Sequence, residues 1–519
     1  MPRSLTSGSP WRVIALFTVP LFLGNVVQQL YQVTDAIVVG RVLGVDALAA
    51  VGATGSFLFL LLGFAWGMTT GFAIPTAQAF GAGDARAVRR SVAAGTILSA
   101  AVSVLVTAGA PFLAEPALRL LRTPPELLPQ ATTFAVVTFL GGAAIMFFNY
   151  LSAVLRAIGD SRTPLLYLVA SCVLNIALVL GAVPGLGLGV GGAALATVVS
   201  QGTSVVLCLA HVRHRVPALH VRREDWRVTR EELRHQLRLG LPMGFQASII
   251  AIGILAVQVR LNELGADAVA AYTTASRVDQ FAMALLGSAG LAVSMFAAQN
   301  LGAGRADRIR TGVLQALWLT VGGSAVLGAG IALGGATLVR VFVGPGEDAV
   351  VAMAAYFLHV NGALYAVLGA LFVLRGALQG LGHTWVPTLT GVLELVCRVG
   401  AAVVLGAAWG YEGVVWGNPL AWMAALALLV PAYVHAHRTL AEQVAARTRG
   451  RRDPVVLGEL ASGGDVLDAV ATDGDRDGHA DGRDAHVDGA RDARAVSGAR
   501  ALQDAGTRRD SDERCSSPS

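Results

Sequence analysis

The chain has 519 residues, of which 54% are hydrophobic and only 14% are charged, and its mean hydropathy is +0.61. These values exclude an ordinary soluble enzyme and indicate an integral membrane protein. The formal net charge is +5, yet residues 450–519 carry more acidic than basic side chains. We therefore attribute the basic excess of residues 1–449 to orientation in a membrane, and we expect no nucleic-acid partner.

About twelve apolar segments are long enough to cross a bilayer as helices, which takes about 20 residues each. The first six are expected at residues 12–38, 46–79, 90–112, 131–153, 164–183 and 189–211. The second six are expected at residues 239–261, 267–298, 309–335, 350–373, 386–407 and 412–435. Their unbroken apolar character favours helices over the alternating strands of a barrel. The first segment exceeds signal-peptide length without a cleavage site, so we expect an uncleaved span.

The two sets of six segments are copies of each other. Residues 78–83 (QAFGAG) recur at 299–304 (QNLGAG), and residues 44–50 recur at 265–271, both at an offset of 221. Four further residues, Gly159, Pro164, Gly189 and Gly192, correspond to Gly382, Pro387, Gly410 and Gly413. Because each half has an even number of spans, the halves must be parallel repeats, an architecture typical of transporters.

The repeat divides the chain into four parts. We expect an N-terminal six-helix lobe at residues 12–211, a basic cytoplasmic linker at 212–238 and a C-terminal six-helix lobe at 239–436. Residues 437–519, with few aliphatic side chains, are expected to form a disordered cytoplasmic tail. Arginine gathers in the connections after even-numbered segments, which predicts cytoplasmic termini and a location in the plasma (inner) membrane.

Small residues in the second segment predict close helix packing. Gly63, Gly67 and Gly71 form two overlapping GxxxG steps, and the second copy keeps small side chains at Ala284, Ser288 and Ala292. We expect these residues to pack helices within a lobe.

Polar side chains interrupt the first segment along one helical face. Gln28, Tyr31, Gln32 and Asp35 are spaced three, four and seven residues apart and therefore share that face. A carboxylate in such a segment is costly unless it faces a cavity, a cation or a partner, so it is a candidate functional site. Alternatively, Asp35 lies near the end of the segment and faces water.

Further polar residues lie in the fourth, fifth and sixth segments. Thr197, Ser200, Gln201 and Ser204 form a stripe that could face the same interior as Asp35. Asn149 lies in the fourth segment and Asn175 in the fifth. Serine and threonine in membrane helices often bond their own backbone, so each of them alone also fits a structural role.

In the second half, Glu394 and Arg398 are spaced i, i+4 and can neutralise each other within the membrane. This pair fits either a structural ion pair or a role in proton or substrate coupling. Weaker signals of the same kind are Arg277, Asp279, His359 and Asn361. Neither a phosphate-binding loop nor a catalytic motif is present, so we expect no enzymatic activity, no ATP use and no cofactor. The four cysteines form no CxxC pair and predict neither a disulfide framework nor a zinc site.

Together these motifs resemble the multidrug and toxic compound extrusion (MATE) family of twelve-helix antiporters, over residues 12–436. The resemblance rests on residues 31–40 (YQVTDAIVVG), the repeated loops at 78–83 and 299–304, residues 155–160 (LRAIGD), and Asn175 followed by residues 189–197 (GVGGAALAT). It implies an all-α membrane protein with two six-helix lobes around a central cleft. It also implies export of small amphipathic organic cations in exchange for protons or sodium ions, and we expect a monomer in the lipid bilayer.

The family's amino-lobe cation site corresponds, position by position, to Asp35, Asn175, Val179 and Thr197. Val179 stands where the family often has a second acid, and this departure argues against sodium binding and against a two-acid proton relay. Asp35 would then carry a proton alone or together with Glu394. A sodium ion at Asp35, Asn175 and Thr197 stays an alternative. Candidate substrate-binding or proton-coupling residues are Gln28, Tyr31, Gln32, Asp35, Asn149, Asn175, Thr197, Gln201, Glu394 and Arg398.

Three other classes remain as alternatives. A lipid-linked oligosaccharide flippase of the wider superfamily would line its cleft with several arginines and favour fourteen spans. A major facilitator carrier is suggested faintly by residues 81–90, although the repeated glutamine loops fit the extrusion family better. A membrane scaffold without transport would need neither Asp35 nor the polar stripe.

Overall fold

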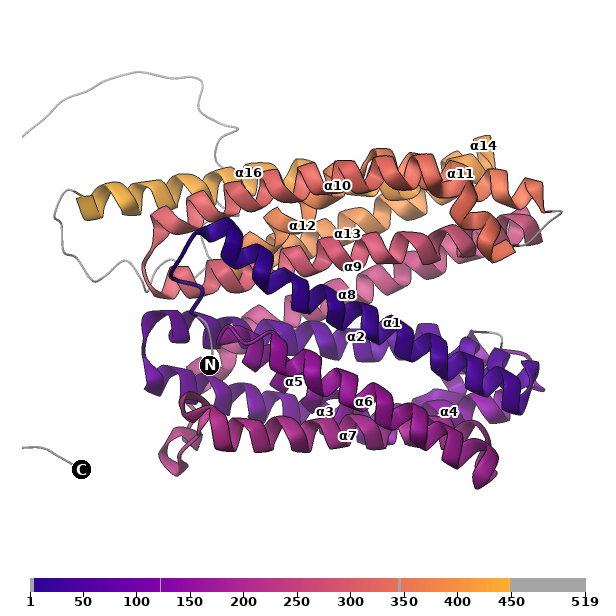
Figure 1. The fold of residues 1–519 in the computed structure, drawn as a ribbon, viewed down its shortest axis with the longest axis horizontal. Helices are drawn as coiled ribbons and strands as arrows, with labels where there is room; N and C mark the ends of the chain where they lie inside the picture. The colour runs from indigo at the N-terminus through magenta and orange to yellow at the C-terminus, as the bar shows by residue number, and fades with distance from the viewer. Residues whose placement is uncertain (1–3, 122, 344–346, 449–519) are drawn as a thin grey trace, which may run out of the picture. The chain divides into compact units, whose positions relative to one another are not determined.

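The computed structural model describes residues 4–121, 123–343 and 347–448, and all regular secondary structure in this part of the chain is helical (Figure 1). The N-terminal half contains α1 (Pro10–Leu43), α2 (Val45–Ala82), α3 (Ala85–Leu120), α4 (Leu128–Leu140), α5 (Gly142–Ala157), α6 (Arg162–Leu180), the π-helix η1 (Gly181–Gly185) and α7 (Gly189–Arg215). The connection to the second half contains two short 3₁₀ helices, η2 (Pro217–Leu219) and η3 (Arg223–Trp226).

The second half repeats this order. It contains α8 (Arg230–Leu264), α9 (Ala266–Gly302), α10 (Ala306–Val343), α11 (Asp348–Ala363), α12 (Tyr365–Gly380), α13 (Trp385–Gly400), the π-helix η4 (Ala401–Leu405), α14 (Gly406–Trp409), α15 (Tyr411–Val415) and α16 (Gly417–Thr448). In both halves the fourth span is broken, by 50° between α4 and α5 and by 52° between α11 and α12. Counting each bent pair as one span, twelve helices of the described residues can cross a membrane. The predicted twelve-helix duplicated fold is confirmed.

The helices extend beyond several boundaries that hydropathy predicts. α8 begins at Arg230 and not near residue 239, because Thr229 and Glu232 form a reciprocal cap, in which the Thr229 N–H donates to Glu232 at 2.8 Å. The connection is therefore shortened to residues 216–229. At the other end, α16 continues to Thr448, past the predicted start of the tail at residue 437. The rest of the predicted tail, residues 449–519, lies outside the described residues.

Two helices pass from one half of the molecule to the other. Ile14, Phe17 and Leu21 in the first half of α1 belong to a buried cluster made mainly of residues from the second half of the chain. The opposite end of α1 packs against α6 and α7 (Figure 1). α8 does the reverse, since Gln236 near its start donates to the Ser91 carbonyl of α3 at 2.7 Å. We call the helices α1–α7 the first lobe and α8–α16 the second lobe. The N-terminal part of α1 packs against the second lobe, and the N-terminal part of α8 packs against the first lobe.

Glycines bring the lobes into close contact, which corrects the expectation that they pack helices within a lobe. A Cβ added at Gly67 or Gly71 of α2 would clash with the backbone of α8 at Met243 or Gly240. Gly63 differs, because its Cβ would approach only Phe59 of the same helix, at 4.0 Å.

The repeated glutamine loops hold the lobes together with near two-fold symmetry. Gln78 of the first lobe donates to the Gly380 carbonyl of the second at 3.2 Å, and Gln299 of the second donates to the Ala157 carbonyl of the first at 2.7 Å. Both loops lie on the side of the molecule that carries the connections after α2, α7 and α9, which we call the arginine-rich side.

Candidate functional site

The Asp35 side chain is half-buried and contacts α6 and α7. This position differs from the alternative in which Asp35 faces water at the end of its helix. The Thr197 hydroxyl of α7 lies 3.4 Å from Asp35 Oδ2, in position to donate a hydrogen bond. The same hydroxyl lies 3.2 Å from the Ala193 carbonyl one turn earlier, so it can donate to either oxygen. A hydroxyl that can switch acceptors suits a carboxyl group that gains and loses charge.

Asn175 of α6 completes the contact between the three helices. In the amide orientation that satisfies its hydrogen bonds, Asn175 donates to Asp35 Oδ1 at 3.2 Å and accepts from the Tyr31 hydroxyl at 3.0 Å. Its oxygen also accepts from the Thr197 backbone N–H at 3.3 Å. Asn175 and Tyr31 are both buried, at 1% and 8% exposure. We call Tyr31, Asp35, Asn175 and Thr197 the Asp35 cluster.

One wall of the Asp35 cluster is apolar. Val179, one turn after Asn175 on α6, is buried and belongs to a hydrophobic cluster with Val39 and Val183. The Val179 side chain has no oxygen atom that could bind a metal ion. The cluster therefore offers one carboxylate and three neutral polar groups to a small cation.

Most of the other predicted polar residues of the first lobe stay apart from the Asp35 cluster. Gln28 and Gln32 are exposed on α1, and Asn149 donates to the Ile145 carbonyl of its own helix at 2.9 Å. Gln201 is buried, and its Oε1 has no hydrogen-bond partner among the residues that the structure describes. Ser200 donates to the Thr197 carbonyl of its own helix and also lies within hydrogen-bond reach of the Tyr31 hydroxyl. Ser204 donates to the Tyr167 carbonyl of α6. Of the predicted stripe on α7, only Thr197 reaches Asp35.

Glu394 and Arg398 lie in a separate network inside the second lobe. Arg398 donates to Glu394 at 3.4 Å, and Arg375 of α12 donates to the other carboxylate oxygen of Glu394. All three side chains are buried, so Glu394 is held by two guanidinium groups and not by one. Arg375 was expected in the connection after the tenth segment. It is found inside the bundle because α12 continues to Gly380. The two glycines among residues 376–380 hide this continuation from helix propensity.

Two further polar residues of the second lobe join this region. Asp279, a weak signal in the sequence, accepts a hydrogen bond from Tyr365 at 2.6 Å, and both side chains are buried. The partner that Asp279 requires was not predictable, because residues 279 and 365 are far apart in the chain. Asn418 of α16 accepts from Arg398 Nε at 3.1 Å.

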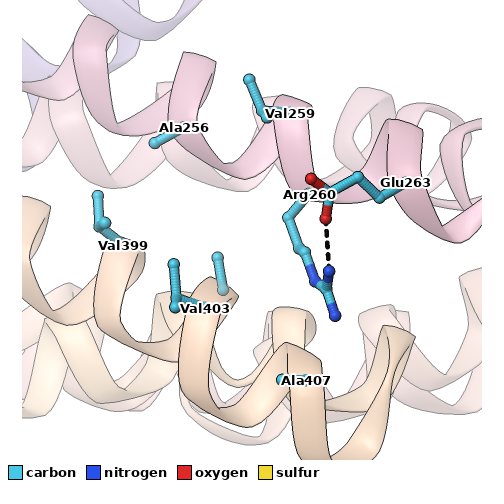
Figure 2. Close-up of a pocket in the computed structure, with 8 residues that line it drawn as sticks. Ala256, Val259, Arg260, Glu263, Val399, Val403 and Ala407 are labelled. Atoms are coloured by element: carbon cyan, nitrogen blue, oxygen red, sulfur yellow. Dashed lines mark hydrogen bonds and ion pairs between the residues drawn. The ribbon is translucent and has the colours of Figure 1, made fainter.

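A pocket lies in the second lobe between α8 and the helices α13, η4 and α14, with Ala256, Val259 and Val403 in its wall (Figure 2). Its polar side chains are Arg260 and Glu263, which form an ion pair with each other. Arg260 also donates to the Gly406 carbonyl at 3.1 Å, which fixes η4 and α14 against α8. Because the charges are already paired and the wall is otherwise apolar, we do not assign substrate binding to this pocket.

Comparisons with known proteins agree with this architecture. The MatE family model matches residues 20–180 and 242–404, one match for each lobe. A probable multidrug resistance protein, YpnP of Bacillus subtilis (strain 168), is 30% identical over 379 residues, which cover 73% of this chain and 84% of the relative. The multidrug resistance protein NorM of Burkholderia vietnamiensis is 26% identical over 433 residues, which cover 80% of this chain and 92% of the relative.

Solved structures show the same fold. A crystal structure of a MATE protein in complex with MaL6 superposes with a TM-score of 0.79 at 23% identity, covering 85% of this chain and 99% of the other. A multidrug resistance MATE transporter in an outward-facing conformation gives a TM-score of 0.78 at 23% identity, covering 84% and 98%. The chain therefore belongs to the MatE (MATE) family of multidrug efflux transporters.

Proposed function

We propose that this protein is a secondary active antiporter that exports small amphipathic organic cations in exchange for protons, by alternating access between its two lobes. The proposal is carried by one observation: a carboxylate inside a predicted membrane span is held between α1, α6 and α7 by Asn175 and Thr197. The proposed exchange uses no cofactor, and one chain contains both lobes, so we propose that a monomer is sufficient.

Coupling follows from competition for one negative charge. Burial favours the neutral form of a carboxyl group, so Asp35 can take up a proton on one side of the membrane and release it on the other. An organic cation and a proton would compete for the same field without contacting each other. Because α1 carries Asp35 and also packs against the second lobe through Phe17 and Leu21, a change of charge at Asp35 can bias the position of the lobes.

The donor set favours a proton over a sodium ion. Hard cations require several oxygen ligands, and at the Asp35 cluster the apolar side chain of Val179 occupies one side. Sodium coupling through Asp35, Asn175 and Thr197 remains the second candidate, with the missing ligands supplied by water.

The observations argue against a flippase for anionic lipid-linked sugars. Such a protein would present unpaired arginines to its substrate, whereas Arg375 and Arg398 both donate to Glu394.

For the orientation in the membrane, we propose that the arginine-rich side is cytoplasmic, in the plasma (inner) membrane, with both termini on that side. The lobe contacts at Gln78 and Gln299 then close the cytoplasmic side in this conformation.

Transport into inverted membrane vesicles tests the proposal. With a fluorescent organic cation and separately imposed proton and sodium gradients, the wild-type protein should accumulate the cation under the proton gradient. Asp35→Asn should reduce this uptake about tenfold or more, because the exchangeable charge is lost.

Asp46→Asn is the matched control. Asp46 is an exposed acid in the first turn of α2, so this variant loses the same charge outside the Asp35 cluster and should keep its uptake. Full proton-driven uptake by an Asp35→Asn protein present at normal level in the membrane would overturn the proposal. Uptake under the sodium gradient alone would replace the proton by sodium.

A further inference from the structure

The second lobe contains a buried charge network that the proposed exchange does not use. Arg375 and Arg398 both donate to Glu394, and all three side chains are less than a tenth exposed. Asp279 is also buried and lies within electrostatic reach of Arg398. Two cations and two anions are thus enclosed together, and their formal charges cancel.

The internal repeat relates this network to the Asp35 cluster. Pro164 and Pro387 near the starts of α6 and α13 set an offset of 223, which places Arg398 where the first lobe has Asn175. Gly189 and Gly410 set an offset of 221 for the following helices, which places Asn418 where the first lobe has Thr197. The two positions are also in contact in both lobes: the Asn175 oxygen accepts from the Thr197 backbone N–H at 3.3 Å, and Arg398 Nε donates to Asn418 Oδ1 at 3.1 Å.

The helix that carries Asp35 has changed in a complementary way. Pro20 in α1 and Pro242 in α8 set an offset of 222, which places Gly253 where the first lobe has Tyr31. A Cβ at Gly253 would lie 3.7 Å from a terminal guanidinium nitrogen of Arg398, so the missing ring leaves space for that group.

No acid replaces Asp35 on α8. The counterpart of Asp35 is Val257 at the offset of 222 set by Pro20 and Pro242. It is Ala256 at the offset of 221 set by residues 44–50 and 265–271 at the other end of the helix. At the corresponding positions the second lobe thus has no carboxylate on its first helix and has a guanidinium group where the first lobe has Asn175.

We propose that the guanidinium of Arg398 is a built-in cation that permanently fills the second lobe's copy of a monovalent-cation site. The inference rests on the proposed role of the Asp35 cluster as a cation site. In the first lobe the cation comes from solution; in the second it is covalently attached. The second lobe therefore keeps one charge state throughout the cycle, and a single exchangeable coupling ion binds, at Asp35.

Removing the built-in cation should expose the vacant site. Around Arg398 lie Asp279 and Tyr272 of α9, Tyr365 and Arg375 of α12, Glu394 of α13 and Asn418 of α16. In Arg398→Asn the two acids face one arginine, which leaves one uncompensated negative charge. A buried negative charge of this kind draws a proton or a sodium ion from solution.

The test measures the melting temperature of the purified full-length protein in detergent. All arms carry Asp35→Asn to silence the first lobe. Sodium chloride is compared with N-methylglucamine chloride at equal ionic strength and at several pH values. The Asp35→Asn protein should be indifferent to sodium and should gain no stability on acidification, whereas adding Arg398→Asn should make the melting temperature rise by about 3 °C or more with sodium or on acidification. Arg398→Lys, which keeps a tethered cation, should stay indifferent, and Asp279→Asn added to Arg398→Asn should abolish the response.

A folded Asp35→Asn/Arg398→Asn protein that responds to sodium and pH in the same way as the Asp35→Asn protein would overturn the inference. If this variant aggregates, extraction in millimolar guanidinium chloride should restore a monodisperse protein, because the free ion refills the site; failure of that rescue also counts against the inference. The proposed function is read separately, from the loss of ion dependence between the wild-type protein and Asp35→Asn.

Discussion

At the scale of single residues, the two lobes handle buried charge in different ways. Among the described residues, the hydrogen-bond partners of Asp35 are neutral, so the proposed uptake and release of a proton there would break no ion pair. Glu394 is fixed between two arginines, and its charge is needed in every state. A carboxylate that accepts hydrogen bonds from neutral donors can gain and lose a proton, whereas a carboxylate paired with two arginines stays charged and stabilises the fold.

The role of Glu394 predicts a large loss of stability in Glu394→Gln. The substitution leaves Arg375 and Arg398 without their shared counter-charge in a buried setting, which costs about 3–5 kcal/mol. Unfolding of the purified protein, followed by temperature or denaturant, measures the loss.

Glu115→Gln is the control for that experiment. Glu115 and Arg119 form an i, i+4 ion pair at 2.5 Å with both side chains largely exposed, so this variant should change stability by about 0.5 kcal/mol at most. Equal effects of the two substitutions would show that the buried network is not the reason for the cost.

At the scale of elements, the packing of α2 against α8 depends on glycine. In Gly71→Ala the new methyl group meets the backbone of Leu239 and Gly240, which cannot move aside as a side chain can. We expect a loss of about 1–3 kcal/mol from overpacking, although alanine favours the helix by about 1 kcal/mol. Gly63→Ala on the same helix has open space and should be neutral or stabilising. Melting temperatures of the two variants make the comparison, and similar values would contradict the assigned contact.

The sequence predicts the elements better than the way in which they meet. The repeat and the apolar segments are local or pairwise patterns, and they locate twelve spans and their duplication. The spacing of Gly67 and Gly71 indicates a close contact, yet it cannot show that the partner is α8 of the other lobe. The broken spans at Gly141 and Leu364 lack a proline signal, and the polar first turns of α8 fall below any hydropathy threshold.

The candidate site shows the same limit. The family resemblance places Asp35, Asn175 and Thr197 in one site, and in the structure these three side chains are in hydrogen-bond contact; their role stays a prediction. Gln28, Gln32 and Asn149 are also polar, but they do not contact Asp35. Helical spacing predicts which residues share one face of a helix, but it does not predict which other helix packs against that face. The partners of Glu394 and Asp279 come from helices that only the fold brings together.

At the scale of the whole molecule, the connection between the lobes is attached to the first lobe. Asp225 in η3 is 2% exposed and accepts from Arg89 of α3 at 2.9 Å. The Arg222 backbone N–H also donates to it at 2.9 Å. Although burial raises the pKa of the Asp225 carboxyl, these hydrogen bonds and the arginine charges outweigh burial and hold that pKa below its ordinary value.

This lowered pKa predicts how stability depends on pH. A group with a depressed pKa contributes stability above its ordinary value of 3.8, and the contribution is lost as the pH falls through the folded-state pKa. Asp225→Asn should therefore lower the melting temperature at neutral pH, and the difference from the wild-type protein should shrink as the solution becomes acidic. Glu224→Gln, which removes an exposed neighbouring acid, should show no such trend. If the difference in melting temperature between Asp225→Asn and the wild-type protein stays constant with pH, the charge of Asp225 is not the source of its contribution to stability, and the prediction is wrong.

Alternating access requires the lobes to separate along the contact between α1 and α9. Asn25 of α1 donates to Ser288 of α9 at 3.0 Å, in the half of both helices nearer the arginine-rich side. A cysteine at each of these positions, joined by a reducible bifunctional thiol reagent, should stop transport of an organic cation into vesicles, and reduction should restore it. The single variants Asn25→Cys and Ser288→Cys, treated in the same way, control for the native cysteines. If the cross-linked protein transports at the uncross-linked rate, this contact persists through the cycle, and the lobes must open about a different line.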